Sequence, residues 1–127
     1  MTKAEFKKLE KLFKKGWAEL SVTGARVKPK YMFPFMCGCP ACEIAVGAMT
    51  RKYLYRCNYC PITRWQRKAD GIAHPCESDM KTYGLWISTR NKDKRKAAAK
   101  EIAKLKWEYQ DEYQDVHLGV DFEKLGK

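Results

Sequence analysis

Two Cys-x-x-Cys clips constrain the fold of this chain more than any other feature of its sequence. Cys39 and Cys42 form the first clip, Cys57 and Cys60 form the second, and fourteen residues separate them. Each clip brings two sulfurs onto one tight turn. Two such turns can surround a zinc ion, which accepts four thiolates in a tetrahedron. The spacing therefore predicts a tetrathiolate metal site with these four cysteines as ligands.

Both the ligand set and the metal have alternatives. Cys37, His74 and Cys76 lie near the clips in sequence, and any of them could supply a ligand, because thiolate and imidazole both suit zinc. An iron–sulfur cluster also takes four thiolates, and the prolines that follow Cys39 and Cys60 are compatible with one. Zinc is the preferred interpretation, since paired clips in a small basic protein are typical of structural zinc.

A disulfide framework is the competing interpretation of the cysteines, and it requires an oxidising compartment. Residues 1–20 show neither the apolar stretch nor the cleavage site of a signal peptide. No segment approaches the ~20 consecutive apolar residues that span a bilayer. We therefore expect a cytoplasmic protein with reduced thiols and no membrane partner.

The pattern at the N-terminus predicts a helix over residues 2–20. Thr2 and Glu5 match a capping box, and apolar residues recur at helical spacing in Phe6, Leu9, Phe13, Trp17 and Leu20. The lysines fall mainly on the opposite side: Lys7, Lys8, Lys11, Lys14 and Lys15. We interpret them as a solvated face, with contact to nucleic-acid phosphates as the alternative.

The rest of the chain predicts a small α+β domain. Residues 51–56 alternate as in a short strand, which would form a β-hairpin with the second clip. This zinc-knuckle or zinc-ribbon-like hairpin would belong to a metal-binding core over 31–88. A long helix over 91–115 and an acidic tail over 116–127 complete the prediction of a single domain of 127 residues.

The net charge of +11 indicates an acidic partner, either nucleic acid or a protein with an acidic surface. Basic residues gather between and after the clips and in the first half of the last predicted helix. Lysine and arginine would contact phosphates there, and a tryptophan among them would stack on a base. The predicted contact residues are Arg51, Lys52, Arg56, Arg64, Trp65, Arg67, Lys68, Lys94, Arg95 and Lys96.

An ordered set of cysteine and aromatic motifs occupies residues 37–86. It comprises Cys39-Pro40-Ala41-Cys42, Cys57-Asn58-Tyr59-Cys60-Pro61-Ile62, and Cys76 followed by Tyr83 and Trp86. This order resembles the short cysteine-rich proteins encoded by many tailed bacteriophages, which pair a Cys-Pro-x-Cys clip with a Cys-x-x-Cys-Pro-Leu clip. The additional Cys37, and Ile62 in place of leucine, depart from that pattern. The resemblance implies a phage accessory protein in the cytoplasm of an infected bacterial host.

The sequence shows no enzymatic motif. It lacks a Gly-rich phosphate loop, a His-Glu-x-x-His helix and a Gly-x-Ser-x-Gly elbow. Neither His74 nor His117 is followed two residues later by the glutamate of a zinc deaminase. We therefore predict no enzyme and no small-molecule substrate, with a metal-dependent nuclease as the enzymatic alternative.

Two functional hypotheses follow. The preferred one is a zinc module that binds nucleic acid through its basic and aromatic surface. The alternative is a phage protein that binds and inhibits a host protein of transcription or antiviral defence, with a purely structural metal. In that case aromatic side chains would be the anchors: Trp65, Tyr83 and Trp86.

Overall fold

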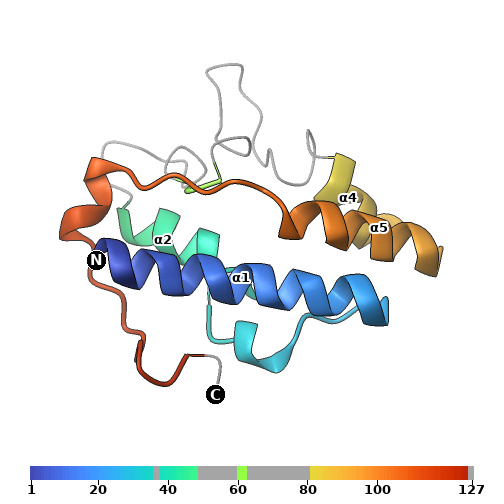
Figure 1. Cartoon of the computed structure of the whole chain (residues 1–127), viewed down its shortest axis with the longest axis horizontal. Helices are drawn as coiled ribbons and strands as arrows, with labels where there is room; N and C mark the ends of the chain where they lie inside the picture. The colour runs from blue at the N-terminus through green and yellow to red at the C-terminus, as the bar shows by residue number, and fades with distance from the viewer. Residues whose placement is uncertain (36–37, 49–59, 63–80, 126–127) are drawn as a thin grey trace.

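The described part of the chain is an assembly of helices. The computed structural model describes residues 1–35, 38–48, 60–62 and 81–125. The elements in these ranges are α1 (Lys3–Thr23), η1 (Lys30–Met32), α2 (Pro40–Ala48), α4 (Lys81–Ser88), α5 (Lys92–Ala103) and η5 (Asp111–Asp115). Helices α1 and α5 lie side by side in opposite directions, with α2 against α1 and α4 against α5 (Figure 1).

Helix α1 confirms the predicted N-terminal helix and its capping box. The Thr2 hydroxyl accepts a 3.0 Å hydrogen bond from the backbone N–H of Glu5, and the Glu5 carboxylate accepts a 2.8 Å bond from the N–H of Thr2. The backbone hydrogen bond to Thr2 lowers the pKa of the Glu5 carboxyl. The helix ends at Gly24, whose φ of 66° is a left-handed conformation that suits glycine.

The predicted apolar stripe of α1 is the axis of the core, because all five of its residues are buried. Aromatic rings from distant segments pack along it. The ring centroid of Trp17 lies 4.9 Å from that of Trp86 in an edge-on arrangement, and Phe6 stacks on Tyr113 at 5.7 Å. Such pairs add about 0.5–1.5 kcal/mol each beyond the burial of their apolar area. They hold α4 and η5 against α1.

The last long helix is shorter than predicted. Helix α5 begins after Asn91, whose side chain accepts a hydrogen bond from the N–H of Lys94, and it ends at Ala103 rather than near residue 115. Beyond it, Trp107 reaches the core, where its ring lies 5.1 Å from that of Phe13. The chain after Ala103 leaves the helix and brings Trp107 to a buried position beside Phe13.

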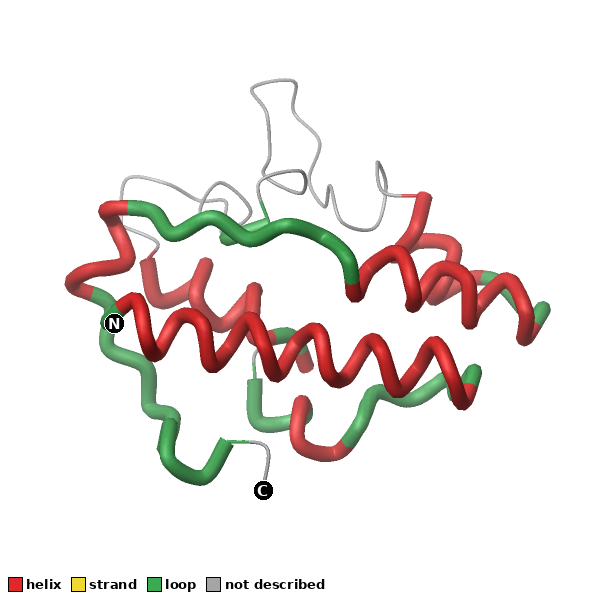
Figure 2. Tube along the Cα trace, in the orientation of Figure 1, coloured by secondary structure: helices red, strands yellow, loops and turns green. Residues whose placement is uncertain are grey.

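The predicted α+β fold with a hairpin core is wrong. The described residues contain no strand, and their β pairing is limited to an isolated bridge between Ile62 and Trp107 (Figure 2). The first clip lies at the start of α2 instead of on a β-turn, because Pro40 occupies the first helical position, which tolerates proline. The strand-like residues 51–56 lie outside the described ranges.

Candidate functional site

The solvent side of α1 carries a row of lysines, as predicted. Lys7, Lys8, Lys11 and Lys15 are exposed, and Lys14 is half-buried. Lys14 forms an ion pair with Glu10 at 3.3 Å. The other four lysines form no ion pair among the described residues, although the charge of Lys8 helps to lower the pKa of the Glu5 carboxyl. This side of α1 is therefore strongly positive.

A second row of lysines follows one face of α5. Lys92, Lys96 and Lys100 recur every four residues, which places them on the same side of a helix. The row begins at the end of α1, since a Cβ built on Gly24 would lie 2.8 Å from Cγ of Lys92 and 3.1 Å from Cε of Lys96. Helices α1 and α5 run side by side (Figure 2), so the α5 row begins near the C-terminal end of α1, whereas the α1 lysines lie between Lys7 and Lys15.

Arg95, one of the predicted contact residues, has a structural position. Its side chain is only 7% exposed, and Nε donates a 2.8 Å hydrogen bond to the carbonyl oxygen of Gly24. A second bond of 3.3 Å joins Nη1 to the carbonyl oxygen of Thr89. The guanidinium therefore ties α5 to α1 and does not face a partner. Of the other two predicted contact residues on α5, Lys94 is exposed and Lys96 is half-buried.

The remaining predicted contact residues lie outside the described ranges: Arg51, Lys52, Arg56, Arg64, Trp65, Arg67 and Lys68. Among the described residues, the candidate contact residues are the lysines of α1 and the row that begins at Lys92. Both rows are visible in the sequence as lysines at helical spacing. Spacing alone does not show that the two helices lie next to each other.

The first cysteine clip forms a pair at the start of α2. Cys39 is buried immediately before the helix, and Cys42 is half-buried in its first turn. A hydrogen bond from the Cys42 thiol lowers the pKa of the Cys39 thiol from 9.0 to about 7, and the Lys28 ammonium acts in the same direction, although burial acts to raise it. A thiolate is the form that binds metal ions, so this pair is chemically suited to hold zinc.

Lys28 connects the clip to α4. Its Nζ donates a 3.1 Å hydrogen bond to Oη of Tyr83 and lies 5.1 Å from the centre of that ring. Burial acts to lower the pKa of Lys28, but charge on Tyr83 and on the two cysteines, with the Tyr83 hydrogen bond, raises it overall. A positive charge therefore persists beside the cysteine pair.

Cys60 is the described cysteine of the second clip. It is buried, its carbonyl oxygen accepts a 3.4 Å hydrogen bond from Nε2 of Gln110, and its thiol lies near Tyr113. Within the described ranges, no three Cys, His, Asp or Glu side chains come together as a metal site. The other ligand candidates lie outside those ranges: Cys37, Cys57, His74 and Cys76. The tetrathiolate site stays a prediction.

Comparison with protein-family models, curated proteins and solved structures finds no match for this chain. Among the helices that the structure describes, none is long and apolar enough to cross a membrane.

Proposed function

We propose that this protein binds nucleic acid through the lysine rows of α1 and α5. The observation that carries the proposal is that α1 and α5 each carry lysines at helical spacing that are exposed or half-buried. Apart from Lys14, their lysines form no ion pair among the described residues. A polyanion bound along these rows would release its condensed counterions, which is the main source of non-specific affinity for DNA and RNA.

The chemistry of the rows favours binding with little sequence readout. A lysine ammonium neutralises a phosphate as a point charge, and phosphate contacts position a protein without reading bases. The two rows comprise Lys7, Lys8, Lys11, Lys14 and Lys15 on α1, and Lys92, Lys96 and Lys100 on α5. Affinity should therefore be similar for unrelated sequences and should fall steeply with salt.

Structural zinc is the second part of the proposal. Cys39, Cys42, Cys57 and Cys60 are its predicted ligands, with Cys37, His74 and Cys76 as alternates. The ion would join the two clips. The resemblance of the cysteine motifs to phage proteins supports an infected bacterial cell as the setting of this activity.

Inhibition of a host protein is less well supported. Of its three predicted anchors, Trp86 is only 6% exposed and packs against Trp17, and Tyr83 is half-buried beside Lys28. Trp65 lies outside the described ranges. Interface anchors need an aromatic surface that a partner can cover, so we retain nucleic-acid binding.

The test is the salt dependence of binding to a DNA duplex of ~20 base pairs between ~50 and ~200 mM salt, measured by fluorescence anisotropy. Neutralising the α5 row with Lys92→Gln, Lys96→Gln and Lys100→Gln should reduce the slope of log affinity against log salt by about 2–3, because each lost phosphate contact contributes about 0.9. The absence of binding at the lowest salt, both to this duplex and to a single strand of equal length, would refute the proposal.

A matched control removes the same charge elsewhere. Arg26, Lys30 and Lys106 are exposed and lie outside both rows. Their replacement by glutamine should change the salt slope by less than about 1. If the control and the α5 variant lose affinity equally, net charge determines binding and the rows are not the interface.

A further inference from the structure

A hollow of about 360 Å³ lies between α1 and the C-terminal segment 121–125. Lys8, Lys11, Leu12 and Lys15 of α1 line one side, and Phe122, Glu123 and Leu125 line the other. One wall is thus cationic, and the remainder is largely apolar with a single carboxylate.

The cationic wall has the form of a row. Lys8, Lys11 and Lys15 are exposed, and the first and last lie about 10 Å apart along the helix at ~1.5 Å per residue. Nζ of Lys15 lies 4.9 Å from the centre of the Tyr31 ring, which restrains it. No described carboxylate pairs with these three lysines. A row of separate charges complements a ligand with repeated charges better than a ligand with one.

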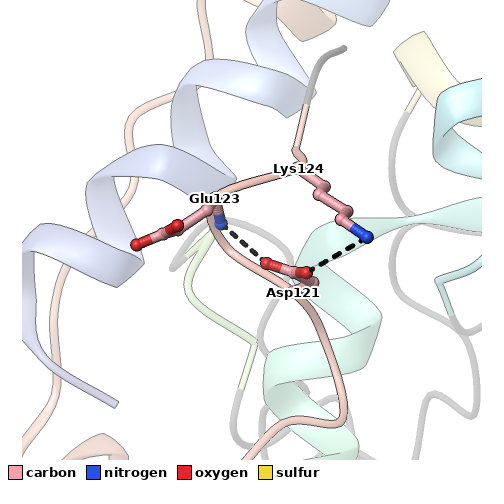
Figure 3. A network of polar contacts seen from close by, with 3 residues as sticks. All are labelled: Asp121, Glu123 and Lys124. Atoms are coloured by element: carbon pink, nitrogen blue, oxygen red, sulfur yellow. Dashed lines mark hydrogen bonds and ion pairs between the residues drawn. The ribbon is translucent and has the colours of Figure 1, made fainter.

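The apolar side is held in place by packing and by a turn. Phe122 and Leu125 are half-buried and pack against the core. The Asp121 carboxylate accepts a 3.1 Å hydrogen bond from the N–H of Glu123 and lies 3.9 Å from Nζ of Lys124 (Figure 3). The side chain of Glu123 points away from Asp121. The Asp121 carboxylate is thus paired within the turn, and Phe122 and Glu123 line the hollow.

We propose that this hollow receives one nucleobase of a single-stranded nucleic acid whose phosphates lie along Lys8, Lys11 and Lys15. The base would rest on the apolar surface of Phe122 and Leu12, since aromatic side chains stack on bases of any sequence. The Glu123 carboxylate would accept a hydrogen bond from an N–H group on the base edge and repel phosphate from that side. The base and the backbone would therefore bind in one orientation.

This inference rests on the proposed nucleic-acid binding and adds a preference for single strands. A base in a duplex is stacked and paired, so it enters a pocket only after unstacking, which costs a few kcal/mol. The hollow is at the small end of the ~300–1,000 Å³ range of ligand sites, which suits one flat ring system. A lipid would use the apolar surface but only one of the three cations.

The test compares two labelled probes on the full chain: an oligodeoxythymidylate of ~20 nucleotides and a duplex of equal length. Phe122→Ala should weaken single-strand binding about tenfold and duplex binding by less than about twofold, because stacking contributes only when the base is free. The matched control is Phe33→Ala, since Phe33 is 54% exposed and does not line the hollow. It should leave both affinities unchanged.

Phe122→Leu separates stacking from folding. Leucine keeps most of the apolar volume, so the thermal midpoint should be retained while the single-strand preference is lost. Equal weakening of both probes by Phe122→Ala, or no weakening of either, would overturn the inference. Displacement of the strand by decanoate or by an acidic peptide at stoichiometric concentration would assign the hollow to that ligand and overturn it too. If the unaltered protein binds neither probe, the proposed function itself fails.

Discussion

The side chain of Arg95 donates a 2.8 Å hydrogen bond to the carbonyl oxygen of Gly24 and thereby joins the start of α5 to the end of α1. Gly24 caps α1, where the exposed carbonyl groups form the negative end of the helix dipole. A buried cation at this point satisfies a carbonyl group and stabilises the helix end. This contact joins the end of α1 to the helix that carries the Lys92 row.

Replacement of Arg95 should affect stability rather than binding. Arg95→Leu is expected to lower the free energy of unfolding by about 1.5–3 kcal/mol, since a charged donor to a buried carbonyl group is lost. Urea unfolding measures the effect. Lys94→Leu is the control, because Lys94 is exposed, and it should change stability by less than about 0.5 kcal/mol. Equal effects of the two variants would show that Arg95 does not tie the helices.

Gly16 is required where α1 meets η1. A Cβ at this position would overlap Sδ of Met32, which is fully buried. Gly16→Ala should therefore destabilise the protein by about 1–3 kcal/mol through overpacking. In a Met32→Ala background the overlap disappears, and the same change should stabilise by up to ~1 kcal/mol through helix propensity. A double-mutant cycle by urea unfolding tests this reversal. The same effect in both backgrounds would contradict it.

Helix α1 was predictable because its determinants are local. The capping box of Thr2 and Glu5 and the apolar stripe specify the helix within one segment. The end of α5 was not predictable in this way. It depends on the packing of Trp107 against Phe13 and Ile62, which are distant in sequence.

Only part of the candidate site was predictable from local sequence. Charge and spacing indicated the lysines of α1, but they did not show that Arg95 is buried, because a basic residue on a helix has the same sequence pattern whether it faces solvent or a helix end. The hollow beside Lys8 also requires segment 121–125, more than a hundred residues further along the chain. Only the tertiary fold brings these parts together.

The stability of the reduced, metal-free protein should rise between about pH 7 and pH 9. The pKa of Cys39 is lowered from 9.0 to about 7, so in this range the unfolded chain binds more protons than the folded one. The resulting stabilisation is complete above pH 9 and is lost as the pH falls through 7. It amounts to at most ~2–3 kcal/mol. Lys28 does not oppose it, because its raised pKa keeps the ammonium charged.

Urea unfolding at several pH values in this range measures the change. Cys39→Ser removes the titrating thiol, so most of the rise should disappear in this variant. A rise of the same size in Cys39→Ser would assign the pH dependence to another group.

The last prediction concerns zinc. Cys42→Ala should abolish zinc binding, measured by elemental analysis of protein purified under reducing conditions, because two thiolates at the start of α2 anchor the site. Cys60→Ala should lose the ion as well, because the second clip supplies the other two predicted ligands. Structural zinc contributes directly to folding, so both variants should also lose much of their thermal stability. Retention of zinc in Cys60→Ala would remove Cys60 from the ligand set and assign its place to Cys37, His74 or Cys76.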